Sequence, residues 1–175
     1  MATHVPHRTP EPRSEGTTLQ EVHLRLVRPA NPAAALGLAT SHLMTKPAFA
    51  QLRFGAWSRV LVGQVNRGHY RLVMDGDDRV RGFLGWALCS EAAAEAWLAG
   101  RDLPSAQARE GDCVLFNAWS ADTPAVHRLV LVAARGAMLG RRLACFRRVY
   151  PDGTSRATRM PVNAFVGRKL DGVGS

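Results

Sequence analysis

Two runs of alternating hydrophobic and polar residues, 68–75 and 79–89, stand on either side of a Gly-Asp-Asp segment. An alternation of period two is typical of a half-buried strand, and the Asp75-Gly76 pair favours a tight turn. The two runs therefore predict a β-hairpin. Towards its end the second run is apolar at nearly every position, so we expect this strand to be central and buried on both faces.

Helices are predicted on either side of the hairpin. Residues 33–44 are rich in Ala and Leu, with Asn31 as a capping residue and Pro47 as the stop. Ser90 is placed to cap a second helix over 91–100, which has an acidic residue in its first turn and a glycine at its end.

A buried strand is predicted over 112–121, and it runs into a third helix over 122–142. Asp122 is expected to cap or charge the start of this helix, and Arg141 and Arg142 are expected in its last turn. Two strands that can pair with each other complete the order, 144–153, which ends in a Pro-Asp-Gly turn, and 154–165.

This order of elements predicts a mixed α/β (α+β) fold in a single domain, with a mixed central sheet and helices on both faces. The strand, helix and strand over 112–150 predict one right-handed βαβ unit. Residues 1–20 contain prolines and charges without a period, so a disordered tail is expected before a domain over 21–170 and a flexible end over 171–175.

No apolar run reaches the roughly 18 residues that a membrane span needs, and the N-terminus lacks the apolar region of a signal peptide. A cytoplasmic protein is expected. The three cysteines lie far apart without CxxC pairing, which favours buried free thiols in a reducing compartment over a catalytic role: Cys89, Cys113 and Cys145. The pattern predicts no metal site.

The net charge of +9 is concentrated near the C-terminus. Residues 128–169 hold ten of the 23 Lys and Arg residues and one acidic residue, Asp152, so the remainder of the chain is neutral. Such a field favours an acidic partner. No nucleic-acid recognition motif accompanies the charge, which argues against nucleic acid.

Several short motifs occur in a shared order along residues 36–160. They include the glycine-rich and aromatic stretches "VLVGQVNRGHYRL", "GFLGWALCSEAAAEAWL", "GDCVLFNAWSA" and "FRRVYPDG". In order and spacing the chain resembles the RTX toxin-activating lysine acyltransferases. That resemblance implies a GNAT-like fold, a homodimer, and transfer of a fatty acyl chain from acyl carrier protein to a lysine of a target protein, without a bound cofactor.

The chain departs from this family at its catalytic positions. The position of the family's catalytic histidine holds Phe49, and the serine before it is Lys46. The position of the catalytic aspartate holds Ala118, or Asn117 if the register slips by one. Acyl transfer to lysine needs a deprotonated amine, and neither Phe49 nor Ala118 can accept its proton.

Three histidines are candidates for a relocated base. His42 lies one helical turn before Lys46, His69 precedes the first hairpin strand, and His127 falls in the first turn of the helix after residue 121. The positive end of that helix favours a neutral imidazole at His127. The alternatives are ordinary structural roles for all three histidines, or a mechanism without a side-chain base.

Arg128, Arg135 and Arg142 recur every seven residues along the third predicted helix, so they form one stripe on its surface. Arg147 and Arg148 follow on the next predicted strand. We predict that these five arginines form a partner-binding surface. Acyl carrier proteins are acidic, so such a surface would attract one. The start of the same helix can hold an anion. Five further residues are expected to line the cleft: Lys46, Gln64, Trp86, Asn117 and Trp119.

Two hypotheses about function follow from the sequence. The first is an active lysine acyltransferase that uses acyl carrier protein and a relocated base. The second is a catalytically inactive relative that binds a partner protein or an acyl or nucleotide ligand in a regulatory role. The tryptophans serve either as packing anchors or as part of an acyl channel.

Overall fold

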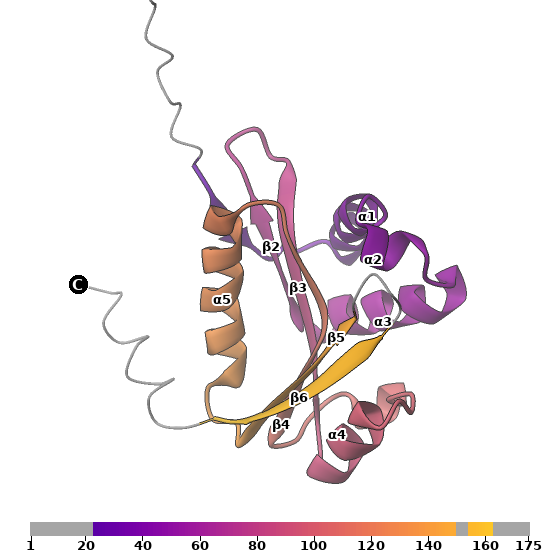
Figure 1. Cartoon of the computed structure of the whole chain (residues 1–175). Coiled ribbons are helices and arrows are strands. Elements are labelled where there is room, and N and C mark those ends of the chain that lie inside the picture. The colour runs from indigo at the N-terminus through magenta and orange to yellow at the C-terminus, as the bar shows by residue number, and fades with distance from the viewer. Residues whose placement is uncertain (1–22, 150–153, 163–175) are drawn as a thin grey trace, which may run out of the picture.

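The computed structural model describes residues 23–149 and 154–162, which form a six-stranded sheet with its strands in chain order (Figure 1). The strands are β1 (Arg25–Val27), β2 (Tyr70–Met74), β3 (Val80–Cys89), β4 (Cys113–Ala121), β5 (Leu143–Val149) and β6 (Ser155–Pro161). The helices are α1 (Pro32–Leu43), α2 (Pro47–Ala50), α3 (Phe54–Arg67), α4 (Glu91–Leu98) and α5 (Pro124–Met138), and a 3₁₀ turn, η1, spans Ser105–Gln107.

The sheet is mixed, as predicted. The pairs β1–β2, β2–β3 and β3–β4 are antiparallel. Strands β4 and β5 are parallel, and β6 is antiparallel to β5. Parallel neighbours need a crossover connection, and α5 provides it, which confirms the βαβ unit. The β2–β3 hairpin is also confirmed, and in its turn the Asp75 carboxylate accepts hydrogen bonds from the backbone N–H groups of Asp77 and Arg79.

Helices cover both faces of the sheet (Figure 1). Helix α5 packs on one face against alternate residues of β3, such as Leu84 and Trp86. Helices α1 and α3 pack on the other face around Phe83, and α4 covers the neighbouring part of that face around Ala87. Successive side chains of β3 thus point to opposite faces of the sheet, and each face carries part of the hydrophobic core. This explains why the strand is apolar at nearly every position.

Local capping explains where most helices begin. The Asn31 side chain accepts from two backbone N–H groups at the start of α1, and the Ser90 hydroxyl accepts from the Ala93 N–H at the start of α4, as predicted. At α5 the capping residue is Thr123, whose hydroxyl accepts from the Val126 N–H. Of the two roles expected for Asp122, that of the cap is therefore wrong, and that of a negative charge beside the start of the helix is left.

The helix α5 is shorter than expected. It ends at Met138, because Gly140 adopts a left-handed backbone conformation (φ 70°) that stops the helix. Arg141 and Arg142 lie beyond the end, so their predicted place in the last turn is wrong. Helix α3 and strand β1 are additional elements that the hydrophobic pattern did not predict.

All three cysteines are free and buried beneath α4: Cys89, Cys113 and Cys145. Burial raises the pKa of Cys89 to about 12 and that of Cys145 to about 11, and it also raises the pKa of Cys113. Thiols of this kind stay protonated at neutral pH and are weak nucleophiles. The interpretation as buried free thiols is confirmed.

Among the described residues no helix is long and apolar enough to cross a membrane. Three predicted features lie outside the described residues: the tail over 1–20, the turn at 151–153 and the flexible end over 171–175.

Helix α3 is fixed on the sheet by the side chain of Gln64. This residue is fully buried and lies directly against Gly85 of β3, where a Cβ atom would stand 2.3 Å from Gln64 Oε1. Glycine at position 85 is therefore required for the close approach of the helix to the sheet.

We predict that Gly85→Ala destabilises the protein by about 1–3 kcal/mol, because the added methyl group overpacks a filled site. Combined with Gln64→Ala, its cost should fall by at least about 0.5 kcal/mol, since the clashing atoms are removed. Urea unfolding measures the free energy of unfolding of the single and the double variants. Gly136→Ala is the control, because its Cβ meets no atom within 4 Å and alanine favours the helix. Additive effects of the Gly85 and Gln64 changes would contradict this packing.

Candidate active site

Strand β4 loses one of its two neighbours half-way along its length. It pairs with β5 from Cys113 to Phe116, and Phe116↔Phe146 is the last pair. Beyond this point β4 continues to Ala121 beside β3, whereas β5 continues beside β6. Within 23–149 and 154–162, the edge of β4 from Asn117 onwards that faces β5 therefore has no strand to pair its backbone N–H and C=O groups.

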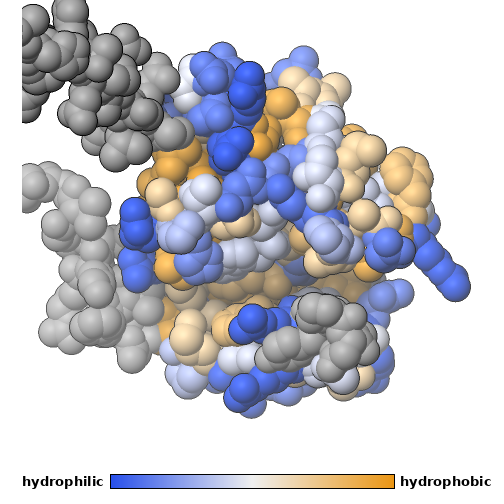
Figure 2. All heavy atoms as spheres, turned by 45° about the horizontal axis from the view of Figure 1, so that its top comes forward, coloured by the Kyte–Doolittle hydropathy of each residue, from blue (hydrophilic) through white to orange (hydrophobic). Residues whose placement is uncertain are grey.

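Figure 2 views the molecule from above the layout of Figure 1, towards the end where β4 runs into α5. Hydrophobic side chains are visible there, set back between two more hydrophilic areas.

A β-bulge marks the start of the open edge. Gly85 pairs with Ala118 and Trp86 pairs with Phe116, so Asn117 is an extra residue in β4. The Gln64 side chain donates a hydrogen bond from Nε2 to Oδ1 of Asn117, and its Oε1 atom is buried without a partner. Two of the predicted cleft residues, Gln64 and Asn117, are thereby brought together at the bulge.

A polar cluster joins the end of β4 to the end of α1. His42 is buried, and its Nε2 atom lies 3.0 Å from the Ser120 hydroxyl oxygen. Lys46 donates to the Asp122 carboxylate at 2.6 Å, and Arg81 Nε lies 3.6 Å from the same carboxylate. Burial, followed by the charge of Lys46, lowers the pKa of His42, so its imidazole is neutral at pH 7. A neutral imidazole beside a hydroxyl can accept a proton through it.

The positions of the missing family dyad lie in an apolar environment. Ala118 is buried in the cluster between α1, α3 and the sheet, and Phe49 of α2 packs against the same cluster. Neither side chain offers a proton acceptor. Of the three candidate histidines, His42 is the one with a hydrogen-bond contact to a side chain of β4, that of Ser120.

His69 lies on the other face of the sheet. Its ring stacks on Trp86 with centroids 5.9 Å apart, and its Nδ1 atom is buried without a hydrogen-bond partner. Burial, with the charges of Arg67 and Arg141, lowers the pKa of His69 to about 4. This histidine is neutral, but it lies on the α5 side with Trp86 and not with the cluster around Ser120.

His127 is exposed in the first turns of α5, where its ring stands 5.6 Å from that of Trp119. Trp119 contacts Phe116 edge to face at 6.0 Å, and it is only partly buried. Trp86 is buried on β3, as expected of a packing anchor. Trp119 is partly exposed because it follows the point where β4 loses β5.

The predicted arginine stripe does not continue along α5 to Arg142. This residue lies beyond α5, and its guanidinium pairs with Glu91 of α4, which also pairs with Arg159. Arg142 therefore serves a contact within the molecule. Two of the remaining arginines lie on α5 and two on β5: Arg128, Arg135, Arg147 and Arg148.

Ser120 was not singled out by the sequence, because its role rests on a contact with His42 across 78 positions. Its place on β4, two residues after Ala118, is the one signal that could have suggested it. Among the described residues no group of three or more His, Cys, Asp or Glu side chains is placed to hold a metal ion.

Comparison with solved structures shows a GNAT-type fold. The chain is similar to the loading GNATL domain of CurA from Lyngbya majuscula, with 12% identity, a TM-score of 0.50 and coverage of 74% of this chain and 68% of that one. A weaker likeness, with a TM-score of 0.44 and 11% identity, is to the GNAT family N-acetyltransferase YhbS from Escherichia coli in complex with CoA, over 88% and 85% of the chains. No family model and no curated protein matches the sequence.

The expected mixed α/β fold with helices on both faces is confirmed by the sheet and by this likeness. The similarity bears out the GNAT-like fold that the sequence resemblance implies, and it does not reach the toxin-activating family.

The lowered histidine pKa values predict a stability that falls with acid. Between about pH 4 and 6.5 the unfolded chain takes up a proton at His69 that the folded protein does not, so the free energy of unfolding decreases as the pH falls through this range. His69→Asn should flatten that slope. Urea unfolding at a series of pH values measures it, and equal slopes for the unmodified protein and the variant would contradict the assignment.

Proposed function

We propose that this chain is an acyltransferase that takes its acyl group from a thioester held along the open edge of β4. The observation that carries the proposal is the separation of β4 from β5 after Phe116, next to the bulge at Asn117. The pantetheine arm of a thioester carries amide groups, which can pair with an open edge as an added strand does. The rings of Phe116 and Trp119 adjoin this edge and suit an apolar acyl chain.

The donor that we propose is an acylated acyl carrier protein, and the acceptor is a lysine of another protein. This choice follows the resemblance of the sequence to the toxin-activating lysine acyltransferases. The lysine nitrogen attacks the thioester carbonyl carbon, the new C–N bond forms and the C–S bond breaks. The sulfur leaves with the bonding electron pair. The lysine ammonium loses one proton to the base before or during attack, and the second proton that the nitrogen loses as the amide forms goes to the sulfur.

His42 is the base in this proposal, and it acts through Ser120. His42 Nε2 lies 3.0 Å from the Ser120 hydroxyl oxygen, and the neutral tautomer with its proton on Nδ1 lets Nε2 accept from that hydroxyl. The hydroxyl oxygen can then accept a proton from the lysine and pass its own to His42. The positive charge of Lys46 near His42 favours its neutral, proton-accepting form, and the charge of Asp122 opposes this effect more weakly.

The arginines of α5 are proposed to dock the acidic carrier protein. Arg128 is exposed on α5, and Arg135 lies two turns further along the same helix. On β5, Arg147 packs over the ring of Trp97 of α4, with its guanidinium carbon 4.6 Å from the ring centre, so it lies on the face of the sheet opposite α5 and outside this surface. Opposite charges of this kind raise the association rate more than the final affinity. The homodimer implied by the resemblance remains a prediction.

A second candidate function is favoured by one observation. The two positions of the family dyad, Phe49 and Ala118, belong to an apolar cluster. A chain with this substitution can retain the thioester site and lose the transfer step, and it would then bind an acylated partner or a nucleotide in a regulatory role. Measured turnover separates the two candidates.

For the active enzyme, we predict that His42→Ala and Ser120→Ala each lower acyl transfer by about 10²-fold or more, the usual contribution of a positioned base. Transfer from an acylated carrier protein to a lysine-containing peptide, or to the chain's own lysines, is measured by intact-mass spectrometry. His23→Ala is the control, because this histidine is exposed at the start of the described chain. Unchanged transfer in His42→Ala, or a loss confined to His127→Ala, would overturn the role of His42. No transfer by the unmodified protein, together with binding of the acylated carrier, would favour the second candidate.

For docking, we predict that reversing Arg128 and Arg135 to Glu together weakens binding of acyl carrier protein at least tenfold, a change of about 1.4 kcal/mol. Binding by the unmodified protein should also weaken as salt rises above about 0.1 M, where exposed charges are screened within roughly 10 Å. Arg101→Glu serves as the control at an exposed site on another part of the surface. Binding that is insensitive to both salt and the reversal would exclude this surface.

A further inference from the structure

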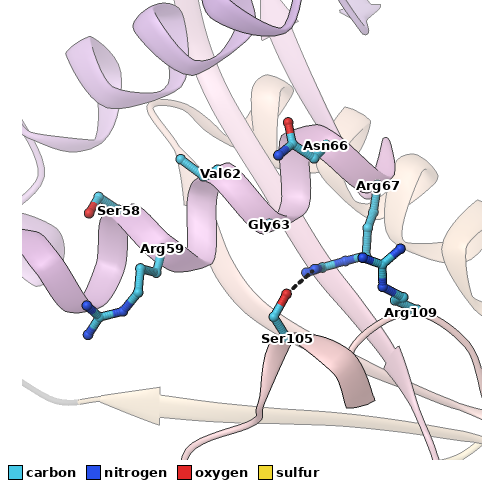
Figure 3. A pocket seen from close by; sticks show the side chains of 8 residues that line it. All are labelled: Ser58, Arg59, Val62, Gly63, Asn66, Arg67, Ser105 and Arg109. Atoms are coloured by element: carbon cyan, nitrogen blue, oxygen red, sulfur yellow. Dashed lines mark hydrogen bonds between the residues drawn. The ribbon is translucent and has the colours of Figure 1, made fainter.

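A pocket of about 420 Å³ lies between α3 and the η1 turn, on the side of α3 away from the sheet (Figure 3). Helix α3 contributes Ser58, Arg59, Asn66 and Arg67 to its wall, and the segment of η1 contributes Ser105 and Arg109. Figure 3 shows the side chains of Arg67 and Arg109 close to Ser105, with Arg59 further along the same helix. The lining contains three guanidinium groups and no carboxylate.

The three arginines of the pocket have no ion-pair partner among the described residues. In the parts of the chain that the structure describes, every ion pair uses other residues than Arg59, Arg67 and Arg109. Arg67 is partly buried, its Nε atom has no hydrogen-bond partner, and its pKa is lowered by burial and by the charge of Arg109. Two neighbouring guanidinium groups repel each other, so an anion placed between them would be strongly favoured.

The local sequence provides the space for this arrangement. Gly63 lies one turn before Arg67, and a Cβ atom at position 63 would stand 2.9 Å from Arg67 Nη1. The glycine thus allows the Arg67 side chain to lie back along α3, where Nη1 donates to the Ser105 hydroxyl oxygen at 3.4 Å. Because glycine inside a helix is destabilising relative to alanine, its presence here fits a demand for space at this wall.

We propose that this pocket binds the phosphate or diphosphate group of a small phosphorylated molecule. The planar fork of an arginine matches two oxygens of a phosphate, and Arg67 and Arg109 can grip such a group from two sides. Ser58, Ser105 and Asn66 supply neutral donors for the remaining oxygens. The volume is that of a small-molecule site and does not suit a macromolecular surface. The proposal stands apart from acyl transfer, because the opposite side of α3 faces β4 through Gln64.

The test is calorimetric titration of the full chain with inorganic pyrophosphate at low salt. We expect one site, and we expect Arg67→Gln and Arg109→Gln each to raise its Kd at least about tenfold, since each removes a charged hydrogen-bond donor. Arg67→Lys should also weaken binding, because it keeps the charge and loses the fork. Arg79→Gln is the matched control, with the same charge change at an exposed position in the β2–β3 turn.

Two results would overturn the proposal. Pyrophosphate binding that is absent, or equal in the unmodified protein and in both glutamine variants of the pocket, would exclude a phosphate site at these arginines. A phosphoserine peptide that binds more tightly than pyrophosphate and also depends on Arg67 and Arg109 would replace the small molecule by a macromolecular partner. Arg109→Gln keeps the test valid if Arg67→Gln fails to fold, because Arg109 is exposed.

Discussion

The separation of β4 from β5 is the constraint on which the rest of the account depends. A strand paired on both sides offers no backbone group to a ligand, whereas a strand that loses one neighbour keeps its shape and gains an open edge. Strand β4 is paired on both sides as far as Phe116, and beyond this residue the edge that faced β5 is open. The bulge at Asn117 stands at this transition, where bulges commonly redirect side chains next to active sites.

Helix α3 supports this transition and links it to a second surface. The side of α3 that faces the sheet places Gln64 against Gly85 and Asn117, so the helix holds the bulge in place through these contacts. Its outer side carries Arg59 and Arg67. Helix α3 thus lies between the bulge in β4 and the basic pocket.

Local chemistry explains which elements the sequence could predict. The β2–β3 hairpin, the Asn31 and Ser90 caps and the central place of β3 all follow from residues that are neighbours in the chain. Helix α3 was harder to predict, because it contains β-branched valines and two glycines and no side chain caps its start. Its stability comes from tertiary burial of Leu61, Gln64 and Val65, although the left-handed Gly68 that ends it is visible as a stop signal.

The candidate site was only partly predictable for a related reason. The motif resemblance indicated Gln64 and Asn117, and the structure brings them together. The end of β4–β5 pairing and the contact of His42 with Ser120 depend on residues far apart in the sequence, so no local pattern reveals them. The predicted arginine stripe was wrong at Arg142 because the seven-residue spacing continued past Gly140, where the helix had already ended.

The central claim is that a thioester arm occupies the open edge of β4. The most direct measurement is the change in backbone amide NMR shifts when the protein is titrated with an acyl-pantetheine analogue whose sulfur is replaced by a methylene group, so that no transfer occurs. The account predicts the largest changes along residues 117–121 and at the start of α5, with saturation at a single site. Saturable binding that leaves the shifts of 117–121 unchanged would contradict it.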